Sequence, residues 1–87
     1  MKIYYYKKFV KHLDQRIKPN FNLYQKFQDR VQIFITDPNN PILNNHQLKG
    51  RKQNYRSFSI TGDIRVIYYQ TEDYVYFIDI GSHNQVY

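Results

Sequence analysis

The spacing of apolar residues predicts a strand followed by a helix at the start of the chain. Residues 2–5 are β-prone and terminal, which suits an edge strand. From about residue 6, apolar side chains recur at spacings of three and four, as they do on one face of a helix: Tyr6, Phe9, Val10, Leu13 and Ile17. Pro19 ends this helix, because proline disfavours helical geometry at the residue before it.

A second amphipathic helix is predicted directly after this turn. Its N-cap is Asn20 or Asn22, and its apolar stripe consists of Leu23, Phe27, Val31 and Phe34. Residues 37–41 combine prolines with residues whose side chains favour turns, so the helix ends there. Two amphipathic helices joined by a tight turn form an αα-hairpin.

The second half of the chain reads as a loop and then three strands. Residues 42–53 have no clear period, which predicts an ordered loop with at most one short strand or helical turn. Strands are predicted over 54–60, 64–70 and 74–80, and residues 81–87 are expected to form a turn and a tail. The order β–α–α–β–β–β predicts a single α+β domain over residues 1–87, with the two-helix hairpin packed on one face of an antiparallel sheet. No clean apolar/polar alternation separates the faces of the first two of these three strands, so both faces are expected to be partly covered.

The composition excludes several classes of protein. The chain has no cysteine, which rules out a disulfide framework and a cysteine-ligated zinc site, and fits a reducing compartment. Its apolar runs are far shorter than the roughly 20 residues that span a bilayer. The N-terminal residues lack the pattern of a secretory signal peptide. We therefore expect a cytoplasmic protein that does not associate with membranes.

The charge is high and unevenly distributed. The net charge is +6, and ten of the 87 residues are tyrosine. Residues 1–56 hold twelve Lys and Arg against three acids, whereas residues 57–87 hold only Arg65 against four acids. This pattern predicts an acidic partner, either a nucleic acid, an acidic protein or an anionic surface. Cations with aromatic rings suit a nucleic acid, but tyrosines also commonly fill strand positions.

Two histidines and an aspartate are candidates for acid–base chemistry. His46 and His83 lie in predicted loops and Asp63 at a β-turn, a set from which such catalysis is built, although each could equally be a solvated loop residue. His12 lies within the basic first helix and is expected to be an ordinary surface residue. No short-spaced pair of ligands is present, so no metal site is expected.

Arg56 and Arg65 stand out because they occupy strands rich in Ile, Val and Tyr. A desolvated arginine needs an anionic partner. Asp63 or Asp79 could supply that partner in a structural ion pair. Alternatively, the guanidinium forks could bind a phosphate. The two interpretations have similar support on physical grounds alone.

Four segments together resemble a known family. They read Asp-Pro-x-x-Pro-Ile-Leu over 37–43, His-Gln-Leu-Lys-Gly over 46–50, Tyr-Arg-Ser-Phe-Ser-Ile-Thr-Gly-Asp-Ile-Arg-Val-Ile-Tyr over 55–68, and Phe-x-Asp-Ile-Gly-Ser-His-x-x-Val-Tyr over 77–87. The pattern resembles the RelE/ParE toxin superfamily, and within it the YafQ-like branch, over nearly the whole chain. The predicted element order is similar to the RelE-like fold of that family.

The resemblance implies a toxin of a type II toxin–antitoxin system that acts as a ribosome-dependent mRNA endonuclease without a metal or cofactor. In such enzymes a ribose 2′-hydroxyl attacks the adjacent phosphorus, leaving a cyclic phosphate and a free 5′-hydroxyl. The positions that match the family's catalytic pattern are His46, Asp63, His83 and Tyr87, and those that match its phosphate-binding positions are Arg56 and Arg65. On this interpretation the two histidines share the acid and base roles, Asp63 orients one of them, and Tyr87 stacks on a base.

The expected surroundings of this site follow from the same resemblance. The basic run Lys49, Arg51 and Lys52 is expected to dock on ribosomal RNA, and an acidic antitoxin is expected to form a hetero-oligomer with the toxin. The chain departs from its relatives at two positions: Ser59 stands where they commonly have a histidine, and Ile64 where they have a tryptophan. The first removes an acid–base group and the second a stacking surface.

Two other functions are compatible with this architecture. One is a ParE-like inhibitor of DNA gyrase that performs no chemistry, although a gyrase binder has no need of paired acid–base groups. The other is a non-catalytic nucleic-acid-binding module that uses the basic helices of residues 6–35. The apolar stripes of those helices favour packing on the sheet instead.

Overall fold

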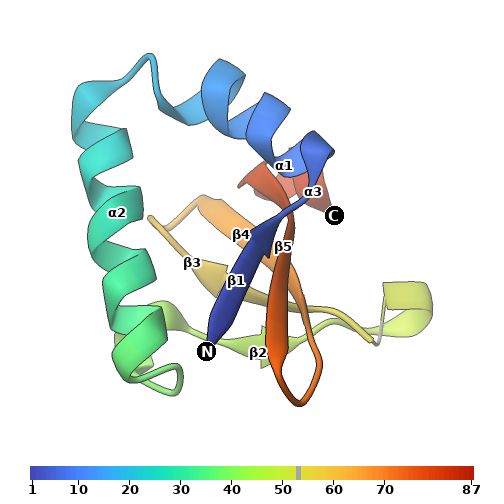
Figure 1. Ribbon diagram of the computed structural model, residues 1–87. Helices are drawn as coiled ribbons and strands as arrows, with labels where there is room; N and C mark the ends of the chain where they lie inside the picture. The colour runs from blue at the N-terminus through green and yellow to red at the C-terminus, as the bar shows by residue number, and fades with distance from the viewer. Residues whose placement is uncertain (53) are drawn as a thin grey trace.

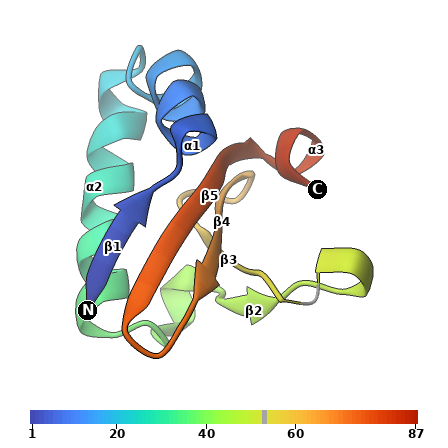
Figure 2. The same cartoon turned by 45° about the vertical axis from the view of Figure 1, so that its right-hand side comes forward.

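Five strands form one sheet, with the long helical segments on one of its faces (Figures 1 and 2). The computed structural model describes residues 1–52 and 54–87. The elements are, in order, β1 (Lys2–Tyr5), α1 (Lys7–His12), the π-helical turn η1 (Leu13–Ile17), α2 (Phe21–Thr36), η2 (Pro41–Leu43), β2 (His46–Gln47), η3 (Gly50–Lys52), β3 (Arg56–Ser59), β4 (Ile64–Gln70), β5 (Tyr74–Ser82) and α3 (His83–Val86). The predicted α+β class is confirmed.

The strand order across the sheet is β1-β5-β4-β3-β2. The strands β2 to β5 pair in antiparallel fashion, as predicted, whereas the edge strand β1 runs parallel to β5. Parallel neighbours need a long crossover between them. Here nearly the whole chain lies between the two strands, so local turn signals could not indicate their direction.

The main core lies between the helical segments and the sheet. Phe34 of α2 stacks on Phe58 of β3 with ring centroids 4.6 Å apart, and Phe9 of α1 meets Phe77 of β5 at 5.3 Å. The predicted helical stripes are mostly buried in this core, but two members of the first stripe are not: Val10 is 39% exposed, and Tyr6, which precedes α1, is 47% exposed. Of the two predicted N-caps for α2, Asn20 is the one used, since its side chain accepts a hydrogen bond from Leu23 N.

A smaller apolar cluster covers the opposite face of the sheet. It consists of Leu48, Ile67 and Val86, with Tyr55 and Ile78 packed against them. The prediction that both faces are partly covered is therefore confirmed. The loop predicted over 42–53 contributes Leu48, which lies between β2 and η3, to this cluster. Among the described residues, no helix combines the length and apolarity that a membrane crossing requires.

The C-terminal segment is more ordered than predicted. Residues 81–87 were expected to form a turn and a tail, but β5 continues to Ser82 and the short helix α3 follows it. A capping box begins α3, in which Ser82 N donates to Gln85 Oε1 at 2.7 Å. Gly81 is tightly enclosed beside it, because a Cβ there would lie 2.6 Å from both Arg16 Nη1 and Gln85 Oε1.

Candidate active site

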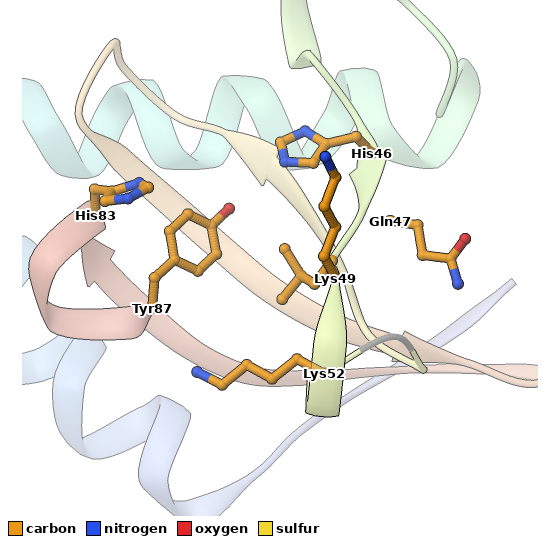
Figure 3. A pocket seen from close by; sticks show the side chains of 7 residues that line it. His46, Gln47, Lys49, Lys52, His83 and Tyr87 are labelled. Carbon is orange, nitrogen blue, oxygen red and sulfur yellow. The ribbon is translucent and has the colours of Figure 1, made fainter.

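A pocket of about 420 Å³ separates α3 from the segment that runs from β2 to η3. In Figure 3, His46 and Lys49 on one side face His83 and Tyr87 on the other. The residues that line the pocket are His46, Gln47, Leu48, Lys49, Lys52, His83 and Tyr87. The structure thus brings together five residues that the sequence singled out from two distant segments.

Arg65 lies buried behind this pocket and contacts only neutral acceptors. The residue is 7% exposed. Its Nε donates to Ser57 Oγ at 2.8 Å, Nη1 to Ser59 Oγ at 2.6 Å and Nη2 to Asn44 O at 3.0 Å. The register explains the two serines: Ser59 pairs with Arg65 across β3 and β4, and Ser57 lies two residues along the same face.

The charge of Arg65 has no carboxylate to balance it among the described residues. Asp63 and Asp79 were the two candidates for a structural ion pair, and neither lies within ion-pair distance of the guanidinium. A buried cation that is hydrogen-bonded but unpaired keeps a strong preference for an anion. Of the two interpretations of this arginine, the geometry favours the phosphate-binding one.

His46 is held against the same backbone carbonyl as Arg65. Its Nδ1 lies 3.0 Å from Asn44 O and 3.3 Å from Arg65 Nη2. Nδ1 needs a proton to bond the carbonyl and a lone pair to accept from Arg65, so the neutral ring can make only one of these bonds. The shorter contact assigns the proton to Nδ1. Nε2 of the neutral ring then carries the lone pair of a potential base.

Tyr87 links the pocket to the buried arginine. Its hydroxyl forms a 2.6 Å hydrogen bond with Ser57 Oγ, and Ser57 is fully buried and accepts from Arg65. The Tyr87 ring also packs edge-on against the His83 ring, with centroids 4.3 Å apart. Tyr87 is thus fixed at both ends, and its position depends on α3 and on β3.

Asp63 approaches His83 through the main chain. Its Oδ1 accepts a 3.4 Å hydrogen bond from His83 N, and its own backbone N donates to Thr61 Oγ1 at 3.2 Å. This contact places the carboxylate beside the first residue of α3. The role of Asp63 in orienting a histidine stays a prediction, now with the backbone of His83 as the group that it contacts.

Arg56 is not brought together with Arg65. It pairs with Tyr68 across β3 and β4, on the helix-covered face of the sheet, whereas Arg65 is on the other face. Its Nε donates to Asn45 Oδ1 at 3.0 Å and to Tyr68 OH at 3.2 Å. Arg56 therefore ties the segment before β2 to the sheet, and the two arginines do not form one clamp in this structure.

The basic run beside the pocket is only partly described. Lys49 is exposed at the pocket rim, and Lys52 Nζ donates to Val86 O at 3.0 Å, which ties η3 to α3. The side chain of Arg51 and the whole of residue 53 lie outside the described part of the chain. RNA docking by these residues stays a prediction.

A second ionic cluster, which the sequence did not reveal, joins α1 to β5. His12 Nδ1 contacts Asp79 Oδ1, and Asp79 is only 5% exposed. Lys8 Nζ and Arg16 Nη1 lie 3.5 Å and 3.8 Å from the same carboxylate. The prediction that His12 is an ordinary surface residue is wrong, because its ring is hydrogen-bonded to this buried carboxylate. The contact could not be predicted locally, since the two residues lie 67 positions apart in the chain.

A metal site in a protein usually needs three or four convergent ligands. Within residues 1–52 and 54–87, no group of three or more His, Cys, Asp or Glu side chains is placed to hold a metal ion.

Solved structures with this fold include bacterial toxins. A metal-bound toxin from Helicobacter pylori has 27% sequence identity and a TM-score of 0.82, covering 100% of this chain and 99% of that chain. YafQ from Escherichia coli strain BL21(DE3) has 21% identity and a TM-score of 0.78, covering 99% and 97%. The E. coli DinJ–YafQ complex has 24% sequence identity and a TM-score of 0.76, covering 99% of this chain and 97% of that chain. The fold is therefore that of the small α+β toxins of the RelE/YafQ type.

The family itself follows from the sequence as a whole. The model of the family described as "Bacterial toxin of type II toxin-antitoxin system, YafQ" matches residues 1–87. The chain belongs to this family, and the resemblance seen in its sequence motifs is confirmed. Comparison with curated protein sequences gives no significant match.

Proposed function

We propose that this toxin is a ribosome-dependent endoribonuclease that cleaves mRNA by attack of a ribose 2′-hydroxyl on the adjacent phosphorus. The observation that supports it most strongly is the unpaired guanidinium of Arg65, buried behind a pocket that two histidines line. A cation held in advance where negative charge develops is what such a reaction requires.

Arg65 is suited to stabilise the pentacoordinate phosphorus. A guanidinium has five N–H donors, of which Ser57, Ser59 and Asn44 use three. In the proposed complex the remaining two, on Nη1 and Nη2, donate to a phosphate oxygen in the fork geometry that arginine favours. Because the other three bonds fix the group, it does not need to reorganise when the charge forms.

The two histidines supply the proton transfers. Nε2 of His46 takes the proton of the 2′-hydroxyl, and the resulting oxygen attacks phosphorus. The bond to the 5′-oxygen breaks, and protonated His83 gives that oxygen its proton. The products are a 2′,3′-cyclic phosphate and a 5′-hydroxyl, and both the nucleophile and the acid–base groups are present without a metal or cofactor.

Tyr87 completes this arrangement as a stacking group. Its hydroxyl is held by Ser57, so the ring is fixed at the pocket wall. A fixed aromatic ring gives an unstacked base a surface to lie on. Stacking there would align the nucleotide next to the cut with Arg65.

The wider surface fits ribosomal RNA and an acidic antitoxin. The first 56 residues carry twelve of the thirteen cations, and Lys49 and Lys52 line the pocket. Such a surface suits phosphate-rich or acidic partners. E. coli YafQ has been solved in complex with DinJ. The proposal therefore includes a cognate antitoxin for this chain. It also includes action of the toxin on ribosomes in the cytoplasm.

The direct test uses purified toxin with ribosomes and a programmed mRNA. His46→Ala and His83→Ala are each expected to slow cleavage by about 10²–10⁴-fold, the usual contribution of a positioned acid or base. Lys26→Ala on the exposed side of α2 serves as the control and should cleave at the parent rate. Cleavage should persist when a metal chelator is added at a concentration that leaves the ribosomes intact.

The outcomes separate this function from the alternatives. Parent-rate cleavage by both histidine variants would contradict the site. Inhibition of gyrase supercoiling without any mRNA cleavage would instead assign the ParE-like function, and salt-dependent DNA binding alone would assign a binding module. Co-expression with the neighbouring open reading frame should relieve growth arrest and yield a complex.

A further inference from the structure

Six of the ten tyrosines form a connected surface on the face of the sheet opposite α2. We call it the tyrosine face, and it consists of Tyr4, Tyr6, Tyr55, Tyr69, Tyr74 and Tyr76. Its ring centroids are 5.4–6.2 Å apart from one neighbour to the next. Figures 1 and 2 both place β1, β5 and β4 side by side, so the rings cross three adjacent strands.

The register explains why these rings meet. Tyr76 of β5 lies opposite Tyr4 of β1 on one side and opposite Tyr69 of β4 on the other. By contrast, Tyr5 points to the other face, where it stacks on Phe77 in the main core at 5.4 Å. Alternate tyrosines of β1 therefore differ in role: one side packs the core and the other forms the outer surface.

Three of the six rings of the tyrosine face are exposed, and the other three, Tyr55, Tyr74 and Tyr76, are half-buried. Tyr4 is 46% exposed, Tyr6 47% and Tyr69 37%. Tyr4 stacks on Tyr76 with an interplanar angle of 23°, so packing across the strands covers part of these rings and leaves the rest in contact with water. A connected aromatic surface of this kind commonly marks an interaction site.

The tyrosine face is continuous with the candidate active site. Arg65 and Tyr69 lie on the same face of β4, four residues apart, with Ile67 between them. Tyr55 packs against the cluster of Leu48, Ile67 and Val86, and Leu48 also lines the pocket. A strand of RNA that leaves the pocket along the sheet would pass directly onto these rings.

The charges around the tyrosine face favour a polyanion. Lys2 lies opposite Tyr74 in the register of β1 and β5, and Lys7 follows Tyr6 at the start of α1. The acids Glu72 and Asp73 lie beyond Tyr74, at the tip of the hairpin between β4 and β5. A path from the pocket across Tyr69 and Tyr76 to Tyr4 and Tyr6 therefore ends among lysines rather than at this acidic tip.

We propose that the tyrosine face is a stacking platform for single-stranded RNA, which holds the nucleotides that extend from the cleavage pocket. The proposal rests on the proposed function, because it takes the cleaved mRNA as the occupant. Each exposed ring offers its face to an unpaired base, and the neighbouring lysines neutralise phosphates. Such contacts tolerate any base sequence, because every base has a flat aromatic face.

The test measures binding without cleavage. A fluorescein-labelled single-stranded RNA with 2′-O-methyl groups lacks the attacking hydroxyl, so the intact toxin can be titrated against it by fluorescence anisotropy. Tyr69→Leu and Tyr4→Leu keep apolar bulk but remove the aromatic face, and each is expected to weaken binding by about tenfold. Tyr69→Phe and Tyr4→Phe keep the ring and should bind like the parent.

A matched control and a second readout come from the chain itself. Phe21 on α2 is 71% exposed and lies outside the tyrosine face, so Phe21→Leu should leave RNA binding unchanged. The chain has no tryptophan, so its intrinsic fluorescence comes from tyrosine. Stacked bases should quench that fluorescence in the parent and less in the leucine variants.

Several results would overturn the platform. One is that both leucine variants bind the single-stranded RNA with the affinity of the parent. Another is that the parent binds double-stranded and single-stranded RNA with equal affinity. A third is that the leucine variants keep RNA binding but lose binding to an acidic antitoxin or to a second copy of the chain. The outcome is distinct from that of the endonuclease proposal. If the leucine variants bind RNA like the parent and the parent still cleaves mRNA on ribosomes, only the platform is rejected. If binding depends on the rings but the parent does not cleave mRNA on ribosomes, only the endonuclease is rejected.

Discussion

Arg65→Met is the substitution that best separates function from stability in this toxin. The side chain donates three hydrogen bonds and is 7% exposed. Methionine has a similar length and flexibility and carries no charge. We expect this variant to remain folded and to lose cleavage of ribosome-bound mRNA.

The magnitudes follow from two opposing contributions to the free energy of unfolding. Each hydrogen bond from a charged donor stabilises by about 1.5–3 kcal/mol. Burying a guanidinium without a carboxylate partner costs several kcal/mol, and methionine avoids that cost. The contributions are of similar size, so the free energy of unfolding should change by less than about 2 kcal/mol. Loss of one fixed donor to the reacting phosphate should lower the cleavage rate by about 10²–10³-fold.

The assay combines urea denaturation with single-turnover cleavage on ribosomes. Arg65→Lys keeps the charge but lacks the planar fork, so its rate should fall between those of the parent and Arg65→Met. Arg56→Met is the matched control on the other face, where it removes contacts to Asn45 and Tyr68. A loss of more than about 4 kcal/mol for Arg65→Met, with a normal cleavage rate per folded molecule, would refute this reasoning.

Three further substitutions test the supports of the site. Gly81→Ala places a methyl group 2.6 Å from two side-chain ends, so we expect the free energy of unfolding to fall by about 1–3 kcal/mol and cleavage to slow. Gly62→Ala is the control, because a Cβ there meets nothing within 4 Å, and it should change neither quantity in the same urea and cleavage assays. Tyr87→Phe removes a 2.6 Å hydrogen bond to Ser57 and should lower stability by about 1 kcal/mol, yet cleave faster than Tyr87→Ala, which also lacks the ring. Burial, with a smaller effect of a neighbouring tyrosine, raises the pKa of Tyr5. Because the folded protein favours the neutral hydroxyl, this tyrosine stabilises the fold below its unfolded pKa of about 10, and that stabilisation is lost as the pH rises through the folded pKa. Phenylalanine does not ionise, so Tyr5→Phe should lose less stability than the parent in thermal melts at alkaline pH.

Local patterns in the sequence predicted most of the fold. The spacing of Phe27, Val31 and Phe34 placed one face of α2 against the sheet, and these residues are buried. The parallel pairing of β1 depends on contacts across nearly the whole chain, which no local signal encodes. Helix α3 has four residues, too few for a helical period, and its only sequence signal was the Ser82–Gln85 capping box.

The site was predictable in its members but not in its geometry. Alternation within a strand indicates which of its residues share a face, but only the register between β3 and β4 shows that Arg56 and Arg65 lie on opposite faces. The hydrogen bond between His12 and Asp79 joins residues 67 positions apart, and nothing local to either one indicates it. The serines that hold Arg65 also gave no signal, because a small polar residue in a strand has no characteristic pattern.

The central claim is that Arg65 and the pocket histidines carry out 2′-hydroxyl attack, and the chemistry of the RNA ends tests it most directly. An mRNA bound to ribosomes is treated with the parent toxin or with Arg65→Met, and the termini are identified by mass spectrometry. The account predicts 2′,3′-cyclic phosphates and 5′-hydroxyls from the parent and at least about a hundredfold fewer from the variant. Ends that carry 3′-hydroxyls and 5′-phosphates, or equal cleavage by both proteins, would contradict it.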